Sequence, residues 1–387
     1  MKTDLAWRNL MHARGRTLAA TAGVAFAAVL IFMQIGFYRA LETSATLVFD
    51  ALEFDLCLHS PDYLRLANPG TFPRQRLYQA RSLGEIIGVQ PLRVGLRYWR
   101  NPDTGEKHPL LVLGVARDGI TFRDPKIQQL IADRLRLPHH VLIDQMTRPE
   151  FGPRNGKKFE DADLGIPHRY EVAGQEVEIT GYYQLGAGFL ANGSIIVAEE
   201  SFLQMSPGFP NDQIELGLLS VRKGVNLAQV RDLLASILPP DVIVLTRQEI
   251  LDRERDFWVR QTSYGLVFQA GIAIALFVGA TIVYQILSSD VNAYLAEYAT
   301  LMAIGYSSAQ LAVIVVRQGC WLAVFGYVPG IILSAILYRV TQTGAQVPME
   351  LSISDAAKVL ALLVAVCIGS GLGAAVRLRR ADPASLY

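Results

Sequence analysis

The residues that could carry chemistry in this sequence are few, and the nearest nucleotide motif is incomplete. Residues 152–158 (GPRNGKK) come closest to the phosphate-cradling loop G-x-x-x-x-G-K-[ST]. That loop needs backbone amides and a lysine to neutralise phosphates, and a hydroxyl residue beside the lysine. Here the glycine spacing is wrong and no hydroxyl residue follows the lysines. We therefore predict a solvated loop and no ATPase site in this chain.

Other chemical patterns are equally weak. Residues 186–191 (GAGFLA) match the loose dinucleotide fingerprint G-x-G-x-x-A, but residues 194–198 read as a strand rather than a helix, which favours a hairpin turn. The pair His139 and His140 has no acidic or cysteine ligand nearby at metal spacing, which indicates a surface loop. Neither G-x-S-x-G nor H-E-x-x-H occurs. We expect no catalytic, cofactor-binding or metal-binding residue in this chain, and we expect the three cysteines to be packing residues: Cys57, Cys320 and Cys367.

One short segment has the character of an interaction site. Residues 290–310 contain strong helix formers from Ala293 to Ile304 and a stop signal at Gly305. Aromatic, apolar and acidic side chains recur there at helical spacing: Tyr294, Glu297, Tyr298, Leu301 and Met302. Such a helix is typical of a knob that enters a partner's groove. A helix resting on lipid headgroups usually carries lysine or arginine on its polar face, and none is present, so the partner is favoured.

The segment lies between hydrophobic runs long enough to cross a membrane. The chain has 387 residues, of which only 18% are charged, and a positive mean hydropathy of +0.27. A helix needs about 20 apolar residues to span the hydrocarbon core. A buried core helix explains one such run in a soluble protein but hardly four. The four predicted transmembrane helices cover residues 18–37, 262–287, 318–338 (starting nearer 311) and 359–376.

The orientation follows from the basic residues that flank these runs. They precede the first span and follow the fourth, which predicts that both termini are cytoplasmic: Lys2, Arg8, Arg14, Arg16, Arg377, Arg379 and Arg380. Residues 288–310 are then cytoplasmic, and the long stretch between the first two spans lies outside. A net charge of +1 gives no electrostatic case for nucleic acid.

The long stretch between the first two spans predicts an α+β domain. Two segments read as helices, 127–136 and 227–238. Short apolar runs between turn signals read as strands: 110–115, 141–144, 170–172, 177–183, 194–198, 216–221 and 242–245. Residues 38–50 continue the first span and residues 246–261 lead into the second, so both are expected to form a stalk or, alternatively, mere connecting helices.

The predicted fold class is therefore an α-helical membrane protein with four transmembrane helices and a large extracytoplasmic α+β domain inserted between spans 1 and 2. The predicted segments run in order: cytoplasmic 1–17, span and stalk 18–50, domain 51–245, stalk and span 246–287, coupling helix 288–310, span 311–338, outer loop 339–355, span 356–376 and tail 377–387. Small residues in two spans indicate close helix packing: Gly271, Ala275, Gly279, Gly369 and Gly373.

Several stretches resemble the permeases of the MacB/FtsX/LolCE (type VII, mechanotransmission) superfamily. Residues 297–305 (EYATLMAIG) resemble its coupling-helix pattern E-x-[AG]-T-L-[RK]-A-[IL]-G, with Met302 in place of the usual basic residue. Residues 5–10 (LAWRNL) and 379–386 (RRADPASL) are similar to its flanking signatures. The cyanobacterial DevC group is the nearest subgroup, by its similarity at residues 54–56, 73–74, 90–92 and 183–189.

The resemblance implies the permease subunit of an ATP-driven tripartite exporter in the inner membrane, without catalytic activity of its own. Its implied partners are a separate ABC ATPase that binds ATP and Mg²⁺, a second copy of this chain, a periplasmic adaptor and a TolC-like outer-membrane duct. The cargo would be lipid, glycolipid or another amphipathic molecule. An FtsX-like signalling subunit and a membrane-anchored periplasmic enzyme are the alternatives. The implied ATPase-coupling residues are Tyr294, Glu297, Tyr298, Thr300, Leu301, Met302, Ile304 and Gly305.

Overall fold

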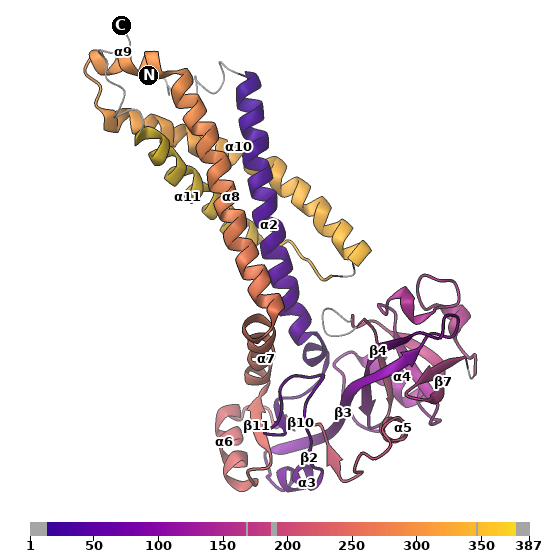
Figure 1. Cartoon of the computed structure of the whole chain (residues 1–387). Helices are drawn as coiled ribbons and strands as arrows, with labels where there is room; N and C mark the ends of the chain where they lie inside the picture. Colours follow the sequence, from indigo (N-terminus) through magenta and orange to yellow (C-terminus); the bar gives the residue numbers. More distant parts are fainter. Residues whose placement is uncertain (1–13, 168, 187–191, 346, 377–387) are drawn as a thin grey trace. The chain divides into compact units, whose positions relative to one another are not determined.

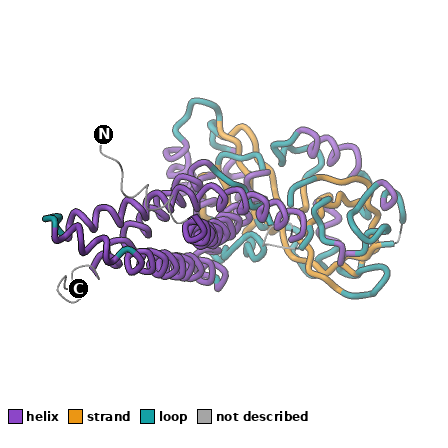
Figure 2. The backbone as a smooth tube through the Cα atoms, turned by 90° about the horizontal axis from the view of Figure 1, so that it is seen from above, coloured by secondary structure: helices purple, strands orange, loops and turns teal. Residues whose placement is uncertain are grey.

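The chain divides into two compact units. The computed structural model describes residues 14–167, 169–186, 192–345 and 347–376 (Figure 1). One unit comprises the chain up to Ala40 together with the part from Ser263 onward, and the other runs from Leu41 to Thr262. All strands among the described residues belong to the second unit, which is the α+β unit, while the described elements of the first unit are helices (Figure 2).

Four long helices carry the predicted transmembrane runs. Each is long and apolar enough to cross a membrane: α2 (Arg14–Ala51), α8 (Ser263–Ala293), α10 (Ser308–Ala345) and α11 (Ile353–Ala375). The prediction of four spans is therefore confirmed, and the chain is a membrane protein. Several of the basic residues used to predict the orientation lie outside the described residues: Lys2, Arg8, Arg377, Arg379 and Arg380.

Apolar side chains from all four long helices form the core of the helical unit. Val24 of α2, Val283 and Leu287 of α8, Leu322 of α10 and Leu363 of α11 are fully buried in one cluster. Cys367 is buried in the same cluster, as its expected packing role requires. Because lipid tails are as apolar as these side chains, association of the helices depends on close van der Waals contact and on polar contacts between them.

The α+β unit is built around a nine-stranded sheet with strand order β11-β1-β10-β3-β4-β8-β5-β7-β6, together with a two-stranded sheet of β2 and β9. The strands are β1 (Leu56–His59), β2 (Phe72–Pro73), β3 (Ile86–Arg100), β4 (Lys107–Val115), β5 (His140–Asp144), β6 (Tyr170–Val172), β7 (Gln175–Tyr183), β8 (Ser194–Ala198), β9 (Gln213–Ile214), β10 (Leu216–Val221) and β11 (Ile243–Thr246). The helices are α3 (Gln75–Arg81), α4 (Pro125–Arg134), α5 (Glu199–Gln204), α6 (Leu227–Ile237) and α7 (Arg247–Asp256).

Part of this sheet closes on itself. Strand β3 pairs with β4 along one side and, through Trp99 and Arg100, with β6 on the other. The pairings β3-β4-β8-β5-β7-β6 therefore form a closed ring of six strands, in which β4–β8 and β5–β7 are parallel. A ring has no open edge within it. Trp99 is fully buried in the apolar cluster of this part and donates a hydrogen bond from Nε1 to the Phe151 carbonyl at 2.9 Å.

The sequence predicted seven of these strands and both longer helices of this unit apart from the stalk, with boundaries shifted by a few residues. It missed β1, the two-residue strands β2 and β9, and the 15-residue strand β3. The sequence of β3 contains Gly88, Pro91 and Gly95. These residues resemble turn signals, because glycine and proline are rare in strand interiors. In the structure Pro91 lies opposite Gly217 of β10, so the sheet tolerates both breakers at one position.

The two predicted stalk helices differ. Helix α2 continues to Ala51 without a break. Helix α7 begins with a capping box between Thr246 and Glu249, and a five-residue π-helical turn follows it at Phe257–Gln261. Thr262 is extended (φ −104°, ψ 155°), so the second stalk helix is interrupted before α8 begins. Residues 246–261 thus form the predicted helical stretch before the second span, but nothing in the sequence indicated the break at Thr262.

Candidate functional site

The predicted interaction segment forms a short helix between α8 and α10. Helix α9 (Leu295–Ala303) ends as the sequence predicted, because Gly305 has φ +109° and closes the helix. The amide of Tyr306 donates to the Leu301 carbonyl at 3.0 Å, and the amide of Gly305 donates to Met302 at 3.0 Å. This pair of hydrogen bonds is the Schellman arrangement, which satisfies the last carbonyls of the helix. The turn therefore holds the helix end in one defined conformation.

A capping box then starts α10. The Ser307 amide donates to Gln310 Oε1 at 2.8 Å, and the Gln310 amide donates to Ser307 Oγ at 3.3 Å. The S-x-x-Q pattern at residues 307–310 is a sequence signal for a helix start, which the sequence analysis missed. Helix α9 therefore ends and α10 begins within four residues, and hydrogen bonds cap both helix ends.

The side chains of α9 divide into two faces. Tyr298 and Ala299 are buried, and Tyr294, Leu301 and Met302 pack against the core of the helical unit. The expectation that the aromatic and apolar stripe is exposed is therefore wrong, because an apolar stripe at helical spacing buries itself against its own unit. The exposed side chains instead include those of Glu297, Thr300 and Ile304, with Ile304 71% exposed.

Ion pairs lie at both ends of the helical unit. Arg16, near the start of α2, lies 3.6 Å from Asp290 of α8, and its guanidinium lies 5.3 Å from the ring centre of Tyr294 at the start of α9. Arg39 of α2 lies 2.9 Å from the buried Asp355 of α11. The first pair ties the base of α9 to α2. Sequence reasoning missed it because nothing in the spacing says that these two helix ends are neighbours.

The predicted packing residues differ in what they touch. A Cβ added at Gly271 would lie 2.4 Å from Gln34 of α2, and one added at Gly279 would lie 3.2 Å from Ala27. Ala275 between them is buried in a cluster with Ile31 and Phe32. Helix α8 thus approaches α2 along this small-residue face.

On α11 the small residues that meet other helices are not the two that were predicted. A Cβ at Gly369 would meet no atom within 4 Å, and one at Gly373 would make only ordinary contact with Tyr284. Gly371 instead faces the backbone of Val316 at 3.3 Å, and Ser370 Oγ donates to the Ala280 carbonyl at 3.1 Å. The prediction for Gly369 is therefore wrong, because the contacting face of α11 is rotated from it.

Two glycines that sequence reasoning missed bring α10 against α2. A Cβ at Gly326 would lie 2.9 Å from the backbone nitrogen of Ala25, and one at Gly330 would lie 2.8 Å from Ala28 Cβ. Their G-x-x-x-G spacing is the signal that could have identified them. We expect Gly326→Val to destabilise the helical unit by about 1–3 kcal/mol, because backbone atoms cannot move aside as a flexible side chain can. Thermal unfolding of the full chain in detergent measures the loss.

Gly369→Val is the matched control for this substitution. It adds the same volume to a transmembrane helix where a Cβ meets nothing, so it should leave the unfolding temperature nearly unchanged. Equal losses from both variants would contradict the assignment of Gly326 as a contact position.

The chemical motifs considered in the sequence lie in turns. Gly152 (φ +80°) and Gly156 (φ +70°) both occupy the left-handed region outside regular helices and strands. Gly186 (φ +90°) follows β7, and its amide donates to Asp144 Oδ2 at 2.8 Å. Residues 187–191 of the dinucleotide-like text lie outside the described residues, and the strand β8 comes next, as predicted, in place of a helix. The hairpin interpretation is wrong, because β5 lies between β7 and β8 in the sheet and pairs with both.

The Asp144 carboxylate organises that turn. It is fully buried and accepts hydrogen bonds from the amides of Met146, Leu185 and Gly186 and from Ser194 Oγ. Burial raises the pKa of Asp144, while these donors act in the opposite direction. The carboxylate is occupied by the fold, which gives it a structural role.

Comparisons with known proteins found a family match for the C-terminal part of the chain. Residues 270–383 match the FtsX-like permease C-terminal family. Among solved structures, the periplasmic region of MacB from Actinobacillus actinomycetemcomitans aligns with 10% identity over 52% of this chain and 92% of that one, at a TM-score of 0.35. The extracellular domain of the noncanonic ABC-type transporter YknZ from Gram-positive bacteria aligns with 16% identity over 50% of this chain and 98% of that one, at 0.32. The comparison with curated proteins gave no match.

Proposed function

We propose that this chain is the permease subunit of an ATP-driven exporter and that the exposed face of α9 is the contact for a separate ABC ATPase. The observation that carries the proposal is the placement of Glu297, Thr300 and Ile304 on one exposed face, between two helices long and apolar enough to span a membrane. The match of residues 270–383 to FtsX-like permeases supports it. An exposed isoleucine on the same face as a carboxylate suits a partner's groove, where apolar contact gives affinity and charge gives orientation.

The proposed mechanism transmits movement instead of opening a pore. Two copies of the chain pair with two ATPase subunits, which hold ATP and Mg²⁺ and close on nucleotide binding. Each closure pushes on α9, whose buried Tyr298 and partly buried Leu301 pass the push to the spans because they pack into the helical core. The spans then move the α+β unit, which acts on cargo outside the cytoplasm. In this proposal both termini are cytoplasmic.

The proposed assembly extends beyond the inner membrane. A periplasmic adaptor and a TolC-like duct would receive the cargo, and the proposed cargo is a lipid, glycolipid or other amphipathic molecule of the kind that the DevC resemblance implies. The two ion pairs described above, Arg16–Asp290 and Arg39–Asp355, lie near the two ends of the helical unit. That distribution favours mechanical coupling over a polar pathway through the bilayer, since such a pathway usually leaves ionisable groups along the spans.

The decisive experiment substitutes the most exposed apolar residue of this face. We expect Ile304→Asp to lower the ATPase rate of the complex reconstituted with its ATPase by at least 10-fold, because a charge replaces the apolar contact while the buried face of α9 stays intact. The Schellman turn is formed by backbone atoms, so the variant should fold. The rate is measured in nanodiscs as phosphate release, next to binding of the ATPase to the permease.

Ile353→Asp is the matched control, since Ile353 is 90% exposed at the first residue of α11. It lies at the other end of the connected helices α10 and α11, and an aspartate is favourable in the first turn of a helix. The control should keep the wild-type rate. If Ile304→Asp also kept it, or if no ATPase bound the wild-type chain, the proposed contact would be wrong.

A transmitter that activates a periplasmic enzyme without transport is the second candidate. The same α9 contact would serve it, so the two functions differ in what the α+β unit binds. Purification of the intact complex from membranes separates them: an adaptor and a duct that copurify support export, whereas a hydrolase in their place supports signalling.

A further inference from the structure

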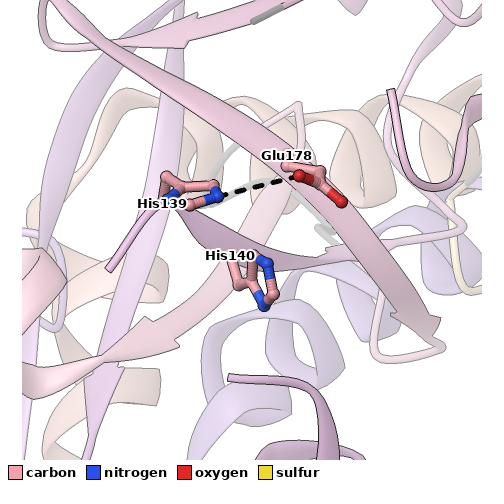
Figure 3. A group of neighbouring side chains, drawn as sticks. All are labelled: His139, His140 and Glu178. Atoms are coloured by element: carbon pink, nitrogen blue, oxygen red, sulfur yellow. Dashed lines mark ion pairs between the residues drawn. The ribbon is translucent and has the colours of Figure 1, made fainter. Parts of the chain in front are cut away.

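Three side chains with metal-ligating atoms meet where β5 and β7 run parallel. One ligand atom from each of His139, His140 and Glu178 lies within 4.8 Å of the others (Figure 3). His139 occupies the turn before β5, His140 is the first residue of β5, and Glu178 lies in β7. The sequence offers no acidic partner near the histidine pair, and the fold supplies one from a strand farther along the chain.

The backbone fixes these three positions. His140 and Glu178 are neighbours in the register of the parallel pair β5–β7. The amide of Glu178 donates to the carbonyl of His139 at 2.8 Å, which ties the turn to the strand. A site built on hydrogen-bonded strands holds its ligands more closely than one built on a free loop.

The histidine tautomer is set as metal sites require. Nδ1 of His140 lies 2.8 Å from the carbonyl oxygen of Arg134. A carbonyl can only accept, so Nδ1 must carry the hydrogen and the lone pair of the ring lies on Nε2. Metal-bound histidines commonly donate their second nitrogen to a backbone carbonyl in this manner, which orients the ring.

The spacing of the three groups is close to that of metal ligands, and a metal ion would draw them closer together. Nε2 of His139 lies 3.7 Å from Oε2 of Glu178. Ligand bonds of about 2.0–2.2 Å in a tetrahedron place neighbouring ligand atoms roughly 3.3–3.6 Å apart. The His139 side chain is 44% exposed, so it can rotate inward and leaves room for a further ligand.

We propose that His139, His140 and Glu178 bind a zinc-like divalent metal ion at the surface of the α+β unit. Two imidazoles and one carboxylate suit Zn²⁺, and they lack the thiolates that soft metals select and the oxygen-rich shell that Mg²⁺ or Ca²⁺ requires. Water or a residue of a bound protein fills the fourth position. The ion cross-links the turn that follows α4 to β7 and stabilises that part of the ring.

Zinc titration of the full chain tests the proposal. The protein is purified in detergent without a histidine tag, stripped of metal, and titrated against a zinc-binding dye. We expect one Zn²⁺ per chain for the wild type, and at least 10-fold weaker binding for each of His139→Ala, His140→Ala and Glu178→Gln. Co²⁺ provides a second measurement, since four-coordinate Co²⁺ has strong visible absorption bands that should disappear in the same three variants.

His108→Ala is the matched control. His108 Nε2 also lies 3.7 Å from a glutamate, Glu106, but no third ligand joins that pair within the described residues. Zinc binding and the Co²⁺ bands should therefore survive in this variant. A wild type that binds no stoichiometric zinc, or three variants that bind it as the wild type does, would overturn the proposal.

Discussion

Replacing Arg93 with methionine should lower the free energy of unfolding of the α+β unit by about 3–5 kcal/mol. Arg93 lies in β3 and is fully buried, with its Nε 3.1 Å from Glu199 and its Nη1 3.7 Å from Glu215. It also donates hydrogen bonds to the carbonyls of Gln213 and Asn211. Methionine keeps the stem of the side chain but removes every one of these donors.

The large effect comes from the carboxylate that is left behind. Glu199 keeps a second cation, because Arg74 also pairs with it. Glu215 is buried and loses its nearest cation. Burial already raises the pKa of Glu215 to about 7, and Arg93 opposes that rise. Without Arg93 the pKa of Glu215 should rise further. The loss of stability relative to the wild type should therefore be largest above neutral pH.

Hydrogen exchange of the β3 and β10 amides in the full chain measures the loss. Arg123→Met is the control, because Arg123 pairs with Glu53 at 3.1 Å while both side chains are 49% exposed. An exposed pair contributes at most about 1 kcal/mol. Adding Glu215→Gln to Arg93→Met should restore part of the stability. If the single variant were as stable as the control, the buried network would not be what holds β3 to the β9–β10 segment.

The same network marks a limit of reading the fold from sequence. Uncharged runs identify transmembrane helices because lipid excludes charge over a fixed thickness, so all four spans were predictable. Strand β3 was not predictable, since its glycines and proline conceal it. A buried arginine on such a strand acquires its partners from α5 and the β9–β10 connection, and only the closed tertiary structure brings them together.

The candidate site shows the same division. The Gly305 stop and the helix before it follow from local rules of helix termination, and the structure contains both. Which face of α9 is exposed does not follow, because periodicity identifies an apolar stripe without saying whether its own unit or a partner covers it. Tyr298 and Ile304 are both apolar enough for either role, yet the first is buried and the second exposed. Glu178 reached the histidine pair through strand pairing, which spacing along the chain cannot reveal.

A second large effect is expected at Glu254, a fully buried carboxyl group of α7. Its Oε1 accepts hydrogen bonds from the Tyr63 hydroxyl and from the Leu66 amide at 3.0 Å. Burial raises the pKa of Glu254 from 4.5 to about 7, although these donors act against the rise. The folded state therefore holds a proton that the unfolded state releases between pH 4.5 and 7. The contribution of Glu254 to the free energy of unfolding is fully present below pH 4.5 and falls by about 3 kcal/mol as the pH rises to 7.

Wild-type stability alone will not reveal this, because His59 acts in the opposite direction. Burial lowers the pKa of His59 from 6.5 to about 4, so its contribution is lost as the pH falls. The difference between Glu254→Gln and the wild type isolates the carboxyl group. From pH 5 to pH 8 that difference should move by about 2–3 kcal/mol in favour of the variant, since glutamine keeps the acceptor for Tyr63 and Leu66 but cannot ionise.

Chemical unfolding of the full chain at the two pH values, followed by hydrogen exchange in the α+β unit, provides the measurement. Asp252→Asn, at an exposed carboxyl of the same helix, is the control and should differ from the wild type by the same amount at both pH values. A difference for Glu254→Gln that did not change with pH would mean that Glu254 stays ionised in the fold. In that case protonation of Glu254 would not stabilise the packing of α7 against the loop that carries Tyr63 and Leu66.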